Sequence, residues 1–102
     1  MTGTEILNDF IDTQLTLCSM AFGDEVANGV KQDFTSYRPE IDETILNLSE
    51  DQLEILPELF KLYTTRYFNT CYNELEEYFL SLPYNIWCDM KNWKEESRRS
   101  NP

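Results

Sequence analysis

The first third of the chain has a strongly periodic pattern of apolar residues. From Ile6 to Phe22 they recur at spacings of three and four, which is the pattern of a helix with one buried face. Thr2 followed by Glu5 has the form of a capping box at a helix N-terminus. Gly23 is a typical residue just after a helix C-terminus. The pattern therefore predicts a first helix over residues 2–22.

The next segment has a weaker pattern. Valines and a phenylalanine repeat every four residues over 24–34, which predicts a second helix, although Gly29 in its middle lowers helix propensity by about 1 kcal/mol. Residues 35–38 are expected to form a connector. Pro39 suits the first turn of a third helix, and apolar residues continue at helical spacing as far as Leu48.

Prolines divide the predicted helices of the second half. Ser49 and Gln52 form another capping-box pattern, which predicts a short helical turn to about Ile55. Pro57 disfavours helical geometry in Leu56, so either a kink or a new helix start is expected there. The longest helix is expected over 57–82, with Cys71 in its apolar stripe. Pro83 is expected to end that helix, and a last helix is expected over 84–98.

Together these elements predict an all-α protein. Alternating apolar and polar residues, the mark of a half-buried strand, are rare. Short connections favour antiparallel neighbours, so we expect a compact bundle of four to six helices. Residues 1–97 are expected to form a single helical domain, and residues 98–102 a frayed polar tail.

The charge of the chain restricts its partners. Nineteen Asp and Glu oppose eight Lys and Arg among 102 residues, for a net charge of −11. Such a chain is repelled by nucleic acid and by anionic membranes and attracted by basic protein surfaces. We therefore expect no direct contact with nucleic acid or membrane. An alternative is that the charge only keeps the protein soluble.

Residue types also argue against catalysis. The chain has no histidine, which removes the commonest general base and the commonest metal ligand. Three widely spaced cysteines without a C-x-x-C pattern suggest free thiols and not a zinc site or a disulfide framework. We expect a binding protein and not an enzyme, with no cofactor and no metal. No secretory signal pattern precedes the first helix, so a cytoplasmic location is expected.

The strongest local signal is an acidic window between Arg38 and Lys61 that holds no base. Three of its acids would form one row at i, i+4 spacing if a helix continued past Leu56, and like charges at that spacing destabilise a helix. Glutamates in the second half could add a second acidic patch. The predicted partner-binding residues are Glu40, Asp42, Glu43, Glu50, Asp51, Glu54, Glu58, Glu74, Glu76 and Glu77. The alternative is an ordinary solvated helix face.

Aromatic residues offer a second kind of contact. Tyr63 and Tyr72 lie near the edges of the apolar stripe, so they are expected to be more exposed than the other tyrosines. Trp87 and Trp93 are six residues apart and face different directions on a helix. One of them is expected to be only partly buried. Either both tryptophans cap the bundle, or one is an apolar anchor for a partner or a second copy of the chain.

In size, acidity, lack of histidine and helical pattern, the chain is similar to two groups of proteins. One comprises phage-encoded inhibitors of host defence nucleases, some of which mimic DNA, and the other comprises bacterial immunity proteins that neutralise nuclease toxins. The similarity is one of bulk properties and implies no site residues. It suggests an inhibitor of a basic nucleic-acid-handling protein. The alternative is a helical adaptor or small structural subunit that docks through an apolar surface, with homodimerisation possible.

Overall fold

Four helices account for nearly all of the chain that the structure describes. The computed structural model describes residues 2–70 and 74–100, with side chains as far as Glu95. The helices are α1 (Gly3–Phe22), α2 (Asp24–Leu46), α3 (Glu50–Asn69) and α4 (Leu75–Ser100). No strand occurs in the described ranges. The predicted all-α bundle is confirmed, with the smallest helix number of the expected range.

Local hydrogen bonds set the helix starts where the sequence indicates them. The Glu5 N–H donates to Thr2 Oγ1 (3.2 Å) and the Thr2 N–H donates to the Glu5 carboxylate (3.0 Å). Ser49 and Gln52 make the same reciprocal pair at the start of α3. Gly23, with φ of 89°, is the only residue between α1 and α2. A side chain is strained at that φ, so glycine permits the abrupt reversal.

The expected breaks at prolines are wrong. Pro39 lies inside α2, Pro57 inside α3 and Pro83 inside α4. The predicted connector 35–38 is helical, and the break in the predicted long helix 57–82 falls instead between Asn69 and Leu75. An internal proline loses one backbone hydrogen bond. Continuing the helix past Pro39 keeps Ile41 and Ile45 on the same buried side of α2 as Phe34, and that burial offsets the loss.

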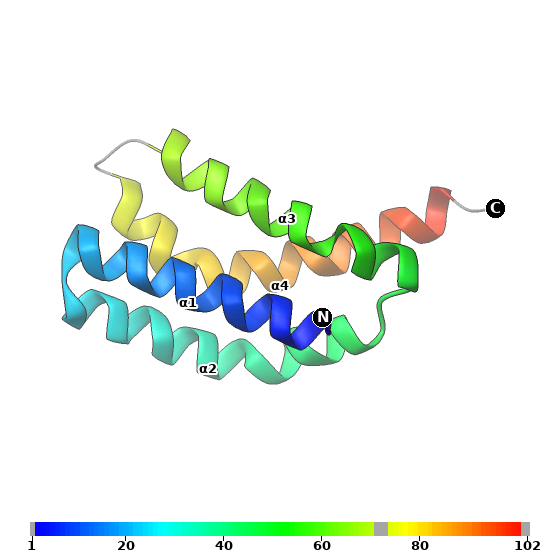
Figure 1. Ribbon diagram of the computed structural model, residues 1–102, viewed down its shortest axis with the longest axis horizontal. Coiled ribbons are helices and arrows are strands. Elements are labelled where there is room, and N and C mark those ends of the chain that lie inside the picture. Colours follow the sequence, from blue (N-terminus) through cyan, green and yellow to red (C-terminus); the bar gives the residue numbers. More distant parts are fainter. Residues whose placement is uncertain (1, 71–73, 101–102) are drawn as a thin grey trace.

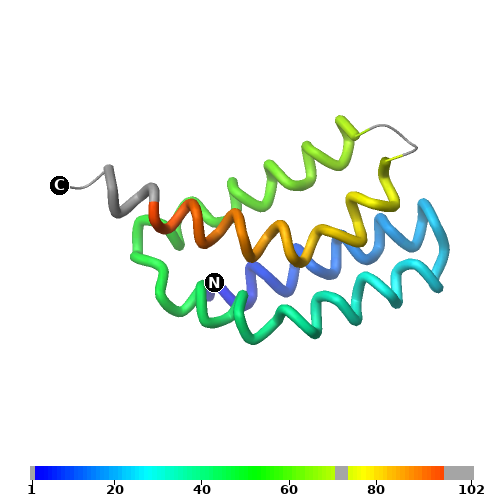
Figure 2. The backbone as a smooth tube through the Cα atoms, turned by 180° about the vertical axis from the view of Figure 1, so that it is seen from behind, coloured from blue at the N-terminus to red at the C-terminus, as the bar shows by residue number. Residues whose placement is uncertain are grey.

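The four helices form a bundle in the order α1, α2, α4, α3 around its axis. α1 and α2 run antiparallel side by side, and α4 packs along α2 in the same direction (Figure 1). The view from behind places α4 in front of the other helices (Figure 2). α3 approaches α1 and α4 less closely than α2 does. As a result, α3 forms one edge of the molecule and has a broad outer face.

Aromatic rings fill the space between α3 and the rest of the bundle. Phe60 of α3 stacks on Phe10 of α1 with ring centroids 4.5 Å apart, and Tyr67 lies 5.1 Å from Phe79 of α4. Such large side chains hold helix axes further apart than aliphatic ones. The remaining core is mainly aliphatic: Leu7, Val30, Ile41, Ile45, Leu56, Leu82, Ile86 and Met90.

The C-terminal part of the chain is helical further than expected. α4 continues to Ser100, so residues 98–100 of the predicted polar tail have helical backbone. Fraying of that tail stays a prediction. Cys71, placed in the predicted apolar stripe, lies outside the described residues. Within the described ranges, every helix is too short or too polar to cross a membrane.

Candidate protein-binding surface

α3 aligns three of the predicted acids in one exposed row. Because α3 continues through Pro57, Glu50, Glu54 and Glu58 follow each other at i, i+4 spacing, with about 5–6 Å between successive Cβ atoms. All three are exposed. None forms an ion pair with a residue that the structure describes. We call these three glutamates the acidic row.

The acids of α2 have a different environment. Asp42 is half-buried and accepts two hydrogen bonds from Arg38 Nε, at 2.9 and 3.0 Å. Arg38 also donates to Asn8 of α1 at 2.7 Å, which holds the guanidinium in place. The Asp42 charge is therefore largely neutralised within the protein. Asp42 is accordingly a weak candidate for contact with a basic partner.

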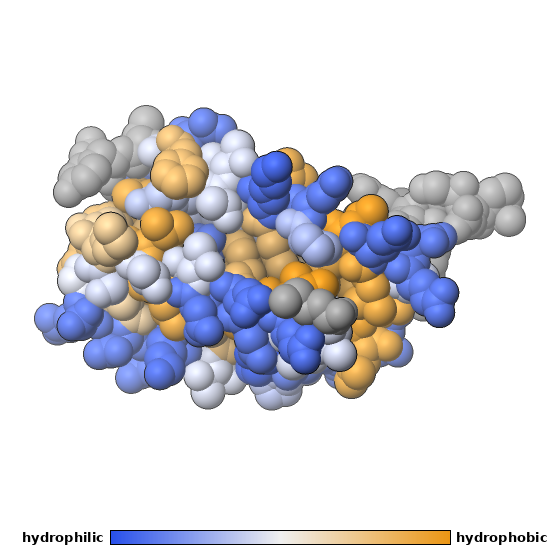
Figure 3. Space-filling model, viewed as in Figure 1, coloured by the Kyte–Doolittle hydropathy of each residue, from blue (hydrophilic) through white to orange (hydrophobic). Residues whose placement is uncertain are grey.

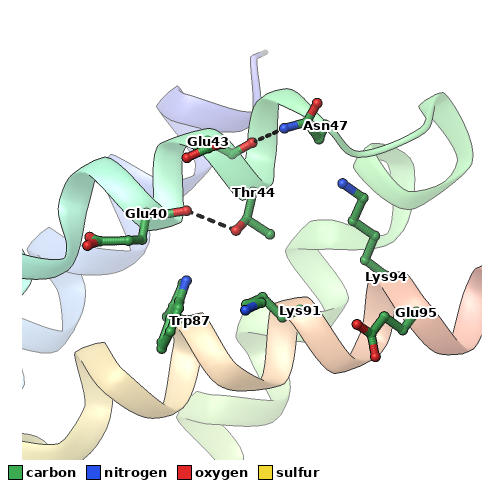
Figure 4. Close-up of a pocket in the computed structure, with 8 residues that line it drawn as sticks. All are labelled: Glu40, Glu43, Thr44, Asn47, Trp87, Lys91, Lys94 and Glu95. Carbon is green, nitrogen blue, oxygen red and sulfur yellow. Dashed lines mark hydrogen bonds between the residues drawn. The ribbon is translucent and has the colours of Figure 1, made fainter.

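Glu40 and Glu43 lie beside lysines that sequence proximity could not reveal. They line a hollow of about 330 Å³ between α2 and α4, together with Lys91 and Lys94 (Figure 4). Trp87 lies at one side of the hollow, and Lys91 Nζ is 4.7 Å from the centroid of its ring. Two lysines of α4 therefore lie near the acids of α2, although Glu95 lines the same hollow, and they weaken the negative field at Glu40 and Glu43.

The second acidic patch lies at the opposite end of the bundle from the start of α3 (Figure 1). Glu76 and Glu77 are in the first turn of α4, and Glu74 directly precedes that helix. All three are exposed. The structure therefore separates the predicted site residues into two groups and does not bring them into one continuous face.

Several acids have a structural role that is independent of any partner. The first turns of all four helices carry acidic residues, which stabilise the positive end of the helix macrodipole. These residues are Glu5, Asp24, Glu25, Glu50, Asp51, Glu76 and Glu77. Glu54 and Glu58 lie beyond the first turn of α3, so helix-end stabilisation does not explain them.

The expected exposure of Tyr63 is wrong. Its ring is buried, with 2% of its surface exposed, and its hydroxyl donates to Asp89 of α4 at 3.0 Å. Burial, followed by the Asp89 charge, raises the pKa of Tyr63. α3 turns this residue inward together with Leu56 and Phe60, which lie at helical spacing from it. Tyr72 lies outside the described residues.

Both tryptophans are half-buried, in separate surroundings. Trp87 packs against the rings of Tyr37 and Tyr84, at 6.3 and 5.8 Å between centroids. Trp93 lies across the groove between α3 and α4, beside Leu59 and Leu62. Trp87 thus packs against aromatic rings of its own chain, whereas Trp93 borders an exposed apolar surface.

The part of that apolar surface on α3 is a feature the sequence interpretation missed, although Trp93 was a predicted anchor. Ile55 is 45% exposed and Leu62 is 62% exposed, and both lie with Leu59 along one side of α3. We call Ile55, Leu59, Leu62 and Trp93 the apolar strip. Its signal was present in the sequence, since positions 55, 59 and 62 repeat at helical spacing beside the buried stripe 56, 60 and 63. The space-filling view from the opposite side shows other apolar groups among the charged ones between α1 and α3 (Figure 3).

The described residues contain no candidate metal site, and no family model matches the chain. In the described part of the chain, no three Cys, Asp or Glu side chains gather closely enough to hold a metal ion. Cys18 is buried and Cys88 half-buried, both as free thiols. Comparison of the chain with protein-family models, with curated proteins and with solved structures finds no match.

Proposed function

We propose that the protein is an inhibitor that binds a basic, nucleic-acid-handling protein through the acidic row of α3. The observation that carries this proposal is the unbroken course of α3 through Pro57, which aligns Glu50, Glu54 and Glu58 on one exposed face. The anti-defence and toxin-immunity kinds of inhibitor, to which the chain is similar in bulk properties, are the two forms this function could take. Binding requires no catalytic group on this chain.

The acidic row opposes helix stability, which supports a role in binding. Two like-charged i, i+4 pairs, Glu50–Glu54 and Glu54–Glu58, each destabilise α3 by about 0.2–0.5 kcal/mol. A lysine at position 54 would turn both repulsions into attractions. Because these carboxylates make no ion pair in the described part of the protein, their charge is available to a partner.

The negative charge of the acidic row suits a basic groove of a partner protein that normally holds nucleic acid. Carboxylates carried on Cβ atoms about 5–6 Å apart along a helix roughly resemble the row of phosphates along a strand. The net charge of −11 adds long-range attraction to a basic protein, which speeds association by about 10–1000-fold at low salt. Increasing salt screens that attraction. The complex is therefore expected to weaken steeply as salt increases.

Affinity capture from host lysate tests the proposal directly. The immobilised protein is expected to retain nucleic-acid-binding proteins at low salt and to release them on addition of either salt or double-stranded DNA. The triple variant Glu50→Gln, Glu54→Gln, Glu58→Gln is expected to lose this capture. Helicity by circular dichroism verifies that the variant is folded.

A matched variant separates the acidic row from net charge alone. Asp9→Asn, Asp12→Asn and Glu25→Gln remove the same three charges from exposed positions of α1 and α2. This control is expected to retain capture. Equal loss in both triple variants would show that only the total charge matters. Failure to capture any nucleic-acid-handling protein at low salt would contradict the proposal.

The apolar strip favours a second candidate function. An adaptor or small structural subunit would dock through Trp93 and the exposed leucine beside it, since large aromatic residues dominate the binding energy of many interfaces. Binding of that kind is nearly insensitive to salt and fails on Trp93→Ala. The acidic-row mechanism gives the reverse result in both measurements.

A further inference from the structure

The apolar strip lies where the molecule is locally neutral. Beside it are Glu58, Lys61, Arg66 and Asp89, two charges of each sign. Arg66 and Asp89 approach to 3.5 Å across the α3–α4 groove. Lys61 and Arg66 are two of only four bases among the first 83 residues. This face therefore differs from the rest of a protein whose net charge is −11.

The strip also has a shape that suits burial. Ile55, Leu59, Leu62 and Trp93 line a hollow of about 570 Å³, with Thr65 at its border. Leu59 and Trp93 form its half-buried floor, and Ile55 and Leu62 stand at its more exposed sides. An apolar patch with a half-buried tryptophan, rimmed by charges, is typical of a protein–protein contact.

The order of residues along α3 is self-complementary about Leu59. Ile55 precedes Leu59 by four positions and Leu62 follows it by three, while Glu58 precedes it by one and Lys61 follows it by two. If two copies of α3 pair antiparallel with their twofold axis at Leu59, Ile55 faces the second copy's leucine. Glu58 and Lys61 lie on the same flank of the strip, and the twofold axis brings Glu58 to the flank where the second copy's lysine lies, so opposite charges meet beside the apolar contact.

We propose that the apolar strip is the interface of a homodimer in which two copies of α3 pack antiparallel across Leu59. A twofold interface uses the same patch on both subunits, which is the self-complementarity that α3 shows. The dimer places Glu58, one glutamate of the acidic row, at the rim of the contact. Glu50 lies nine residues from Leu59 along α3, further from the twofold axis.

The salt dependence of the dimer is opposite to that of the proposed inhibitory complex. Two copies at −11 each repel at long range, and salt screens that repulsion. Dimerisation is therefore expected to strengthen as salt increases, whereas binding to a basic partner weakens. The dimer does not depend on the proposed function. Glu58 belongs both to the acidic row and to the rim of the apolar strip, and the opposite salt dependences distinguish failure of one proposal from failure of the other.

Sedimentation equilibrium of the purified protein, over a range of concentrations and salt, measures the dimer. The unmodified chain is expected to dimerise, more strongly at high salt. Leu62→Glu is expected to increase the dimer dissociation constant by about 10–100-fold. The control is Leu46→Glu, because Leu46 is 80% exposed at the end of α2, away from the strip. The control is expected to dimerise like the unmodified chain.

A charge-exchange experiment tests the antiparallel register without touching the apolar core. Glu58→Lys and Lys61→Glu each place like charges across the twofold axis, so each variant alone is expected to dimerise more weakly. Mixing the two restores both opposite-charge contacts and is expected to give a heterodimer. Glu25→Lys mixed with Lys31→Glu carries the same net charges on α2 and is expected to give no preferential heterodimer.

Two results would overturn the homodimer. One is a chain that stays monomeric at high concentration and high salt. The other is a dimer that tolerates Leu62→Glu and shows no preference in the mixture of Glu58→Lys with Lys61→Glu. Circular dichroism verifies that each variant keeps its helices, so that loss of the dimer is not loss of the fold.

Discussion

At the residue scale, the close packing around Gly3 predicts that a larger side chain there destabilises the protein. A Cβ atom at Gly3 would lie 2.5 Å from Ile45 Cγ2 and 3.0 Å from Leu53 Cδ2. Ile45 is buried, so its methyl group has little room to move. Gly3→Ala is therefore expected to lower the free energy of unfolding by about 1–3 kcal/mol in urea titrations.

Gly29→Ala is the matched control for Gly3→Ala. A Cβ at Gly29 would meet nothing within 4 Å, and the position is inside α2. The substitution is expected to raise the free energy of unfolding by about 0.5–1 kcal/mol, because alanine has the higher helix propensity. A shift in the same direction for both variants would argue against the close approach at Gly3.

Buried tyrosines predict a loss of stability at alkaline pH. Desolvation by burial raises the pKa of Tyr78 to about 12 from 10.0, and its hydroxyl donates to the Tyr63 carbonyl at 2.6 Å. A raised pKa stabilises the fold below pH 10, and this contribution is lost as pH rises from about 10 to 12. Urea midpoints across this range are expected to fall for the unmodified protein and to fall less for Tyr78→Phe. Parallel profiles would contradict this assignment.

At the residue scale, contacts between residues close in the sequence could be predicted, but contacts between side chains of different helices could not. Both capping boxes depend only on residues three apart, so Thr2 with Glu5 and Ser49 with Gln52 were predictable. The inward position of Tyr63 depends on Asp89 of another helix. Similarly, buried Gln14 of α1 donates to Thr64 of α3, a contact that requires the arrangement of the bundle.

At the scale of the helices, the main feature is that α2, α3 and α4 each continue through an internal proline. An internal proline removes a backbone hydrogen bond and disfavours the helix by about 3 kcal/mol. Pro57 is exposed, whereas Pro83 is fully buried. Pro57→Ala is expected to stabilise the protein by about 1–3 kcal/mol, because it restores the bond without loss of packing.

Pro83→Ala is expected to stabilise less or to destabilise, because it also leaves a cavity in the core. Urea unfolding of the two variants checks the comparison. Equal gains at both positions would show that the Pro83 ring contributes little to packing.

The same prolines explain why the helix boundaries were predicted poorly. Rules for proline describe local backbone geometry, and they placed breaks at Pro39, Pro57 and Pro83. The burial of Ile41, Tyr63 and Ile86 on continuous faces outweighs those local terms. For this reason the sequence predicted the acidic row only on the condition that the helix continues beyond Leu56.

At the scale of the whole molecule, charge opposes folding. Nineteen acids and eight bases leave a net charge of −11, and such self-repulsion destabilises a compact state. Sodium chloride is expected to raise the free energy of unfolding. Glu54→Gln removes both repulsive pairs of the acidic row and is expected to stabilise by about 0.4–1 kcal/mol at low salt, with a smaller gain at high salt.

Asp12→Asn, on α1, removes the same charge outside the acidic row and is the control for Glu54→Gln. An equal gain from the two changes would show that the row has no special repulsion.

The positions of Lys91 and Lys94 beside Glu40 and Glu43 depend on the arrangement of the whole molecule. The spacing of residues in the sequence did not predict that α2 and α4 are neighbours.

The one-residue link at Gly23 bears on the order in which the chain folds. α1 and α2 are adjacent in sequence and closely packed, so joining them loses little loop entropy. We expect this hairpin to be formed in the folding transition state, before α3 docks. Ala27→Gly in α2 should then slow folding, whereas Leu56→Ala in α3 should mainly accelerate unfolding. Stopped-flow kinetics in urea distinguish this order from its reverse, in which α3 nucleates the bundle and α1 joins last.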